Sequence, residues 1–206
     1  MVKINEITEF LNEFAPNCYA EDYDNVGLLV GEKDKEINKI MLTLDADDEV
    51  VKDAADKKCD LVISHHPLIF KPLKRVVSDD SVSRTVINLI KNDMSLISVH
   101  TNFDSVKSGL CDLFFDKIAD TKERVSIEGD EENGCGRIAE LECPSKLSEI
   151  LETIKNKILK HYPSMVFSVE NMLQPVSIIG PEEEDDDDDD DSFIEFSDST
   201  DFAIAA

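Results

Sequence analysis

Between residues 40 and 118, short apolar segments alternate with longer segments whose apolar residues fall on one side of a helix. The apolar segments are residues 40–44, 61–64 and 96–99, and the amphipathic segments are residues 45–58, 81–91 and 106–118. This alternation is typical of βαβ units, in which helices connect parallel strands and cover the sheet. The sequence therefore predicts an α/β fold with a mainly parallel sheet flanked by helices.

Further elements are expected on either side of this region. Residues 4–14 carry apolar side chains three or four positions apart and precede Pro16, which predicts an amphipathic helix. Residues 28–30 lie between two glycines and predict a short strand or a tight loop. A second set of elements follows a polar loop at 128–133. We expect strands at 136–141, 165–169 and 176–179 and a helix at 146–159.

The charge is concentrated near one end of the sequence. The formal net charge is −25, and residues 182–206 hold 13 acidic residues and no basic one, which leaves −12 on the first 181 residues. Ten consecutive acids at 182–191 repel one another and bury no apolar surface, so we expect a disordered acidic tail. The overall charge argues against a protein that binds nucleic acid by neutralising phosphates.

The expected location is the cytoplasm. No run of about 18 apolar residues predicts a membrane span, and the first residues lack the apolar core of a secretory signal. The five cysteines are odd in number and have no CxxC spacing, as expected for reduced thiols that pack as small hydrophobic residues.

Polar residues follow each of the three central strands. Asp45 follows the first, His65 and His66 follow the second, and His100 and Asp104 follow the third. The carboxyl ends of neighbouring parallel strands form one rim, where ligands bind in such sheets. Adjacent histidines diverge and suit two metal ions, while a carboxylate is a hard donor that completes such a site. We therefore predict a metal site formed by His65, His66 and Asp104.

Other interpretations of these residues stay open. A single histidine is more often a hydrogen-bonded structural residue than a metal ligand, and His161 after a helix fits a capping or surface position. Asp45 and His100 would either support the ligands or carry protons, or only cap their loops. A serine or cysteine nucleophile is less well supported, because no nucleophile elbow occurs and no cysteine adjoins a histidine of the rim. No glycine-rich phosphate-binding motif occurs either, so no organic cofactor is predicted.

Several short blocks occur in a characteristic order: DNVGLLVG at 24–31, LD at 44–45, ISHHPLIF at 63–70, HTNFD at 100–104, GCGRIAEL at 134–141 and QPV at 174–176. Together they resemble the Nif-three-like family, that is, the NGG-one-interacting-factor-three family, also called GTP cyclohydrolase one type two-like. The resemblance covers roughly residues 1–180. It implies two similar α/β lobes, a pair of divalent metal ions such as zinc, iron or manganese, and ring-shaped hexamers. By position, His65, His66 and Asp104 match metal ligands of the family.

One block of the family has no counterpart in the sequence. The family completes its metal site with a C-terminal histidine and a bridging glutamate, whereas no histidine follows His161 here. We therefore expect a first lobe at 1–120 with the metal-ligand loops, a partial second lobe at 121–181 and the acidic tail at 182–206. The function implied is a metal-dependent hydrolase with an incomplete site that holds one or two ions. The alternative is a non-catalytic interaction or scaffold protein, linked to transcription, that acts through protein partners without binding membranes.

Overall fold

A computed structural model describes residues 2–130, 132–143, 145–161 and 204–205. The chain divides into two compact units, Met1–Leu110 and Cys111–Ala206, and each is described by itself. The strands expected at 165–169 and 176–179 and the acidic run at 182–191 lie outside the described residues. No helix in the described ranges combines the length and apolar character needed to cross a membrane.

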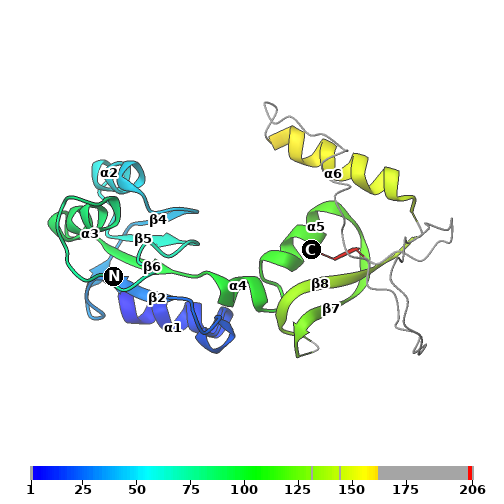
Figure 1. Cartoon of the computed structure of the whole chain (residues 1–206), viewed down its shortest axis with the longest axis horizontal. Coiled ribbons are helices and arrows are strands. Elements are labelled where there is room, and N and C mark those ends of the chain that lie inside the picture. The colour runs from blue at the N-terminus through cyan, green and yellow to red at the C-terminus, as the bar shows by residue number, and fades with distance from the viewer. Residues whose placement is uncertain (1, 131, 144, 162–203, 206) are drawn as a thin grey trace, which may run out of the picture. The chain divides into compact units, whose positions relative to one another are not determined.

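The first unit is built on a four-stranded sheet with the strand order β2-β6-β5-β4 (Figure 1). The strands are β2 (Gly27–Val30), β4 (Ile40–Thr43), β5 (Leu61–Ser64) and β6 (Ser95–Ser98). β4 pairs with β5 and β5 pairs with β6 in parallel, whereas β2 runs antiparallel to β6. The three predicted central strands are confirmed, and the alternative of a tight loop at 28–30 is wrong.

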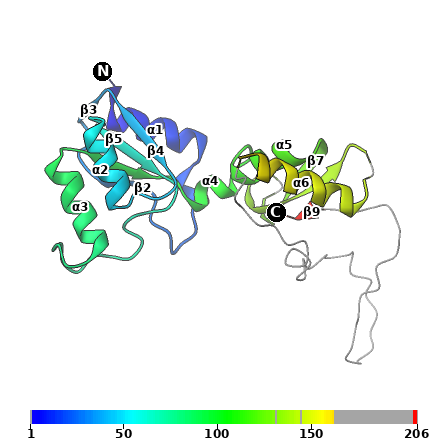
Figure 2. The same ribbon diagram turned by 90° about the horizontal axis from the view of Figure 1, so that it is seen from above.

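Helices cover both faces of this sheet (Figure 1). On one face, α2 (Asp48–Asp56) and α3 (Ser81–Lys91) pack side chains such as Val51 and Leu89 against Val62 and Leu96 of the sheet (Figure 2). On the other face, α1 (Ile4–Phe14) packs Ile4 against the sheet in a core with Leu61 and Ile97. Two short strands, β1 (Val2–Lys3) and β3 (Glu36–Ile37), pair next to α1, and the 3-10 helix η1 (Asn17–Tyr19) follows it.

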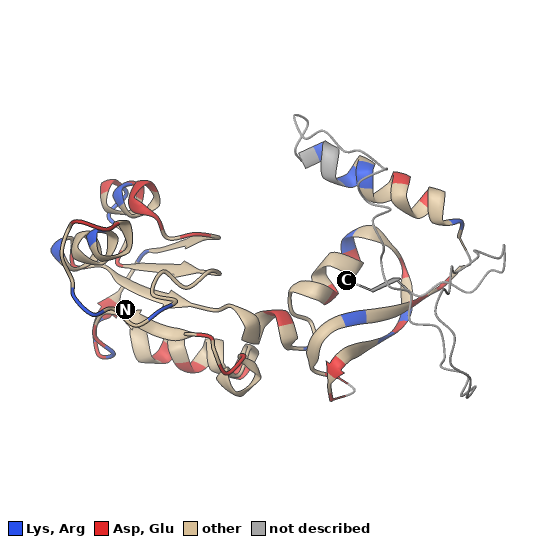
Figure 3. Ribbon diagram, in the orientation of Figure 1, with Lys and Arg blue, Asp and Glu red and all other residues tan. Residues whose placement is uncertain are grey.

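Aspartates set the start of both helices on the α2–α3 face. The Asp47 carboxylate accepts a hydrogen bond from Val50 N at 2.8 Å, and the Asp80 carboxylate accepts one from Ser83 N at 2.9 Å. These side chains satisfy amide groups that the first helical turn leaves without a partner. α2 therefore begins at Asp48, three residues after the predicted start of the segment. Figure 3 shows acidic residues, in red, along α2 and along α1.

The helix predicted at 106–118 is two helices. α4 (Thr101–Ser105) begins earlier and α5 (Leu110–Ile118) begins later than expected. Between them Val106 has an extended backbone and Ser108 has a φ of 65°. A Cβ on Gly109 would lie 2.0 Å from the carbonyl oxygen of Phe103, so only glycine fits this turn without a shift. The break keeps Asp104 in a short helix of its own.

The second unit contains an antiparallel sheet with the strand order β7-β8-β9. Its elements are β7 (Thr121–Gly129), β8 (Gly134–Leu141), β9 (Ile204–Ala205) and the helix α6 (Leu147–His161). Phe115 of α5, Ala139 of β8 and Ile150 of α6 share its core. The α/β class is confirmed for the chain. Within the residues that the structure describes, a mainly parallel sheet is found in the first unit and an antiparallel one in the second, so the predicted likeness of the two lobes is confirmed only in part.

Candidate metal centre

The polar residues that follow β4, β5 and β6 meet at one end of the first sheet. The strand pairing continues past β5, because His65 N donates to Thr43 O at 3.1 Å and His66 N donates to Leu44 O at 2.9 Å. On the other side, Val99 N donates to Ser64 O at 3.0 Å. This continued ladder fixes the two histidines between the loops that carry the remaining polar residues.

His65 bridges the two loops that follow β5 and β6. Its Nδ1 lies 3.0 Å from the carbonyl oxygen of Val99, and its Nε2 lies 3.7 Å from Asp104 Oδ1. Only 18% of the His65 side chain and 31% of the Asp104 side chain are exposed. The structure therefore brings these two predicted ligands together in a half-buried position.

His66 is paired with the residue that follows β4. Its Nδ1 lies 2.8 Å from Asp45 Oδ1, at a more exposed place on the rim. The His65 and His66 rings have centroids 5.0 Å apart. Adjacent residues thus present two imidazoles to one space, and Asp45 supports the second of them.

His100 belongs to the same cluster. One ring nitrogen of each of His65, His66 and His100 lies within 4.8 Å of those of the other two. His100 Nδ1 lies 3.0 Å from both carboxylate oxygens of Asp24, whose side chain is fully buried. Sequence reasoning considered His100 as a supporting residue but gave Asp24 no role. The only signal for Asp24 was its place in the DNVGLLVG block.

The carboxylates of Asp104 and Asp24, which adjoin the cluster, have opposite pKa shifts. Burial raises the pKa of Asp104, and the charges of His65 and His100 oppose that increase only in part. Burial would also raise the pKa of Asp24, but hydrogen bonds from Thr101, His100 and backbone amides outweigh it and lower that pKa. Asp104 Oδ1 is buried without a hydrogen-bond partner. A cation beside this oxygen would supply the favourable interaction that no hydrogen-bond donor provides, so the residues fit a metal ion.

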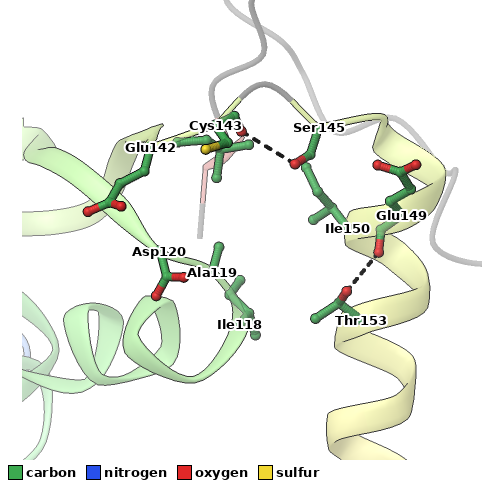
Figure 4. A pocket seen from close by; sticks show the side chains of 10 residues that line it. Ile118, Ala119, Asp120, Glu142, Cys143, Ser145, Glu149, Ile150 and Thr153 are labelled. Carbon is green, nitrogen blue, oxygen red and sulfur yellow. Dashed lines mark hydrogen bonds between the residues drawn. The ribbon is translucent and has the colours of Figure 1, made fainter.

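Among the described residues, one cavity adjoins His66 and another lies in the second unit. A cavity of about 360 Å³ opens beside His66 and is bordered by the first residues of α2 and α3. Its lining includes the carboxylates Asp45, Asp47, Asp48 and Glu49. The other, of about 200 Å³, lies in the second unit between α5, β8 and α6, and no histidine lines it (Figure 4). The first cavity therefore offers a substrate space next to the candidate metal centre.

Comparison with known proteins places the chain in a family. The sequence profile described as Duf34/NIF3 (NGG1p interacting factor 3) matches residues 2–181. The chain belongs to the Duf34/NIF3 family. The resemblance stated for the sequence blocks is thereby confirmed.

Relatives of this NIF3 family member come from bacteria and animals. A protein named GTP cyclohydrolase 1 type 2 homolog from Clostridium perfringens is 39% identical over 159 residues, which are 76% of this chain and 61% of that protein. NIF3-like protein 1 from Drosophila melanogaster is 35% identical over 158 residues, 76% of this chain and 54% of that protein. The chain thus spans little more than half the length of these curated relatives.

Solved structures share the fold. Reduced HcgD from Methanocaldococcus jannaschii is 33% identical with a TM-score of 0.67, covering 75% of this chain and 60% of that one. A hypothetical protein from Staphylococcus aureus is 26% identical with a TM-score of 0.68, covering 76% and 64% of the two chains. The likeness supports the α/β fold assigned above.

Proposed function

We propose that this NIF3 family member binds a divalent metal ion through His65, His66 and Asp104 and acts as a metal-dependent hydrolase. The observation that carries the proposal is the unpaired buried Oδ1 of Asp104, which faces His65 Nε2 at 3.7 Å. A buried carboxylate oxygen without a donor is unfavourable in a protein, and a cation relieves that cost. Nitrogen and oxygen donors together suit zinc, iron or manganese.

The residues of the chain have separate tasks in this proposal. A divalent ion would supply an activated water for attack on a C=N or ester carbon. The Val99 carbonyl and the Asp45 carboxylate orient the two imidazoles by accepting hydrogen bonds from Nδ1. The cavity beside His66 admits a small substrate. Its acidic lining repels phosphate groups, so we expect hydrolysis of GTP to be very slow.

Several properties of the family extend this proposal to the whole protein. We propose a homo-oligomer, with the hexameric ring as the family arrangement, and a cytoplasmic location. We propose one or two divalent ions per chain, at most one of them tightly held. We propose no membrane partner and no direct binding of nucleic acid.

A non-catalytic interaction or scaffold protein of the same fold is the second candidate. This candidate is favoured by the metal-ligating side chains available. In the described part of the chain, the one group of three or more such side chains close together is the histidine cluster, which contains no carboxylate. A bridging carboxylate for a second ion is therefore not provided by that cluster. Such a protein would use the same site to hold a metal that stabilises the fold.

Metal analysis combined with hydrolysis assays separates the two candidates. Purified protein is dialysed, its bound metals are quantified per chain, and turnover of GTP and of an uncharged aryl ester is measured. His65→Ala should abolish metal binding in both cases, whereas His161→Ala, the control, should leave it unchanged. Turnover that disappears in His65→Ala supports the hydrolase, and bound metal without turnover supports the scaffold. Absence of tightly bound metal from the wild-type protein contradicts the metal site itself.

A further inference from the structure

His100 is not among the three residues assigned to the metal, yet its ring faces theirs. The His100 ring centroid lies 5.1 Å from that of His65 and 5.6 Å from that of His66. All three rings contribute a nitrogen to the cluster whose members lie within 4.8 Å of one another. The position of the His100 ring is therefore compatible with a ligand of the same ion.

The three histidines are held in the same chemical form. In each ring Nδ1 faces an oxygen that only accepts hydrogen bonds, a backbone carbonyl for His65 and a carboxylate for His66 and His100. An Nδ1 that donates a hydrogen bond to such an oxygen leaves Nε2 as the nitrogen through which an imidazole can bind a metal. An oxygen partner on the far nitrogen is the usual support of a metal-binding histidine.

Asp24 is buried and extensively hydrogen-bonded, unlike a carboxylate in a surface contact. Its side chain is fully buried and accepts hydrogen bonds from Asn25 N at 2.7 Å, from Thr101 N at 3.2 Å and from the Thr101 hydroxyl, besides His100. These bonds offset the cost of removing a carboxylate from water. They also fix the carboxylate in one place, so that it holds the His100 ring in one orientation across a separation of 76 residues.

We propose that His100 is a third nitrogen ligand of the metal ion and that Asp24 is the residue that positions it. The inference rests on the proposed function, in which His65, His66 and Asp104 hold the ion. Adding His100 gives three imidazole nitrogens and one carboxylate oxygen within the first unit. This donor set fits zinc or ferrous iron and disfavours magnesium and calcium, which take oxygen ligands almost exclusively.

Nuclear magnetic resonance of the histidine rings tests the inference directly. The full chain has four histidines, so long-range ¹H–¹⁵N spectra of the ¹⁵N-labelled, chelator-treated protein hold few signals. Spectra are recorded before and after one equivalent of Zn²⁺. We expect the Nε2 signals of His65, His66 and His100 to shift and that of His161 to stay. If only His65 and His66 shift, the inference is wrong while the metal site stands. If no ring shifts, the proposed function itself fails.

Zinc affinity, measured by competition with a chromophoric chelator, gives a second readout. Asp24→Asn should weaken binding about 10–100-fold, the usual effect of losing an oriented partner of a ligand. Asp22→Asn, a neighbouring exposed acid, is the matched control and should bind zinc as the wild-type protein does. His100→Asn should weaken binding by at least as much as Asp24→Asn. Wild-type affinity in a folded His100→Asn variant overturns the inference, whereas His65→Ala tests only the proposed function.

Discussion

The charge of Asp104 has opposite effects on the stability of the metal-free protein and on metal binding. Its buried Oδ1 has no hydrogen-bond partner and its pKa is raised by burial, so its charge destabilises the metal-free protein at neutral pH. We predict that Asp104→Asn leaves the melting temperature of the metal-free protein unchanged or raises it. The same variant should lose the increase in melting temperature that Zn²⁺ gives the wild-type protein. Differential scanning fluorimetry with and without Zn²⁺ measures both effects.

Asp60 provides the control for this residue. Its Oδ2 accepts hydrogen bonds from Asn38 N at 2.8 Å and from Lys39 N at 2.9 Å, so the carboxylate is satisfied. Asp60→Asn should lower the melting temperature of the metal-free protein and keep the increase with Zn²⁺. A large loss of stability in metal-free Asp104→Asn would contradict the assignment of Asp104 as a ligand without a structural partner.

The residues of the site differ in how far the sequence alone could place them. His65, His66 and Asp104 follow predicted strands, so the rule for the carboxyl ends of parallel strands brought them to one rim. The contact between Asp24 and His100 depends on β2, which lies antiparallel to β6 at the edge of the sheet. Nothing in the local pattern around Asp24 specifies a partner 76 residues away, so the pairing emerged only from the tertiary structure.

At the scale of elements, an ionic contact joins α2 to α3. Arg84 Nε donates to Asp48 Oδ2 at 2.7 Å and the Thr85 hydroxyl donates to Asp48 Oδ1 at 2.8 Å. These bonds lower the pKa of Asp48. Because the folded-state pKa is lower than the unfolded one, the contact stabilises the protein above the unfolded pKa, and this stabilisation is lost as pH falls through the folded pKa.

We therefore predict that Asp48→Asn destabilises the protein at neutral pH and that its difference from the wild-type protein shrinks under acid conditions. Urea unfolding at pH values from about 7 down to about 3 spans the titration of an ordinary aspartate and the region below it. Glu49→Gln, the neighbouring acid on α2, should show a much smaller difference at neutral pH. A destabilisation by Asp48→Asn that stays constant over this range would contradict the ionic origin of the contact.

Gly109 sets the break between α4 and α5. A Cβ there would lie 2.0 Å from Phe103 O and 2.7 Å from Val106 O, both of them backbone atoms that cannot rotate away. We predict that Gly109→Ala destabilises the protein by about 1–3 kcal/mol, the usual cost of overpacking. Because Phe103 adjoins Asp104, zinc affinity should also fall. Unfolding in urea and the chelator competition measure the two effects, and unchanged values for both would show that the turn relaxes freely.

The elements show where sequence patterns succeed and where they stop. Apolar strands and amphipathic helices of the first unit were predicted because their side chains repeat with the period of a buried strand or a one-sided helix. β7 was not predicted, because three consecutive charged residues near its start, Lys122, Glu123 and Arg124, interrupt the alternation of apolar and polar residues that is typical of a half-exposed strand. The break between α4 and α5 at Gly109 was not predicted, because apolar residues continue at helical spacing on both sides of it.

At the scale of the whole molecule, the acidic end of the chain is predicted to contribute nothing to the stability of the first unit. Residues 182–206 hold 13 acids and no base, and ten of those acids are consecutive. Such a run buries no apolar surface. Deleting 182–206 should leave the melting temperature of the first unit unchanged, as followed by the amide signals of β5 and β6. The deletion also removes β9, the partner of β8, so signals of the second unit serve as the positive control. A drop of many degrees in the first unit would contradict the prediction.

The number of metal ions per chain follows from the charges available to hold them. Two divalent ions about 4 Å apart repel by roughly 16 kcal/mol at an effective dielectric constant of ~20, so a pair needs anionic ligands between them. The cluster described here offers the imidazoles of three histidines, with the Asp104 carboxylate beside His65, while Asp45 and Asp24 are engaged with Nδ1 of His66 and His100. One ion is satisfied by these donors, whereas a second would stand beside it without a bridge. We therefore predict one tightly held ion per chain, measured by elemental analysis after dialysis. Two tightly held ions per chain would mean that residues beyond those described supply the bridge, as in the dinuclear site that the family resemblance implies.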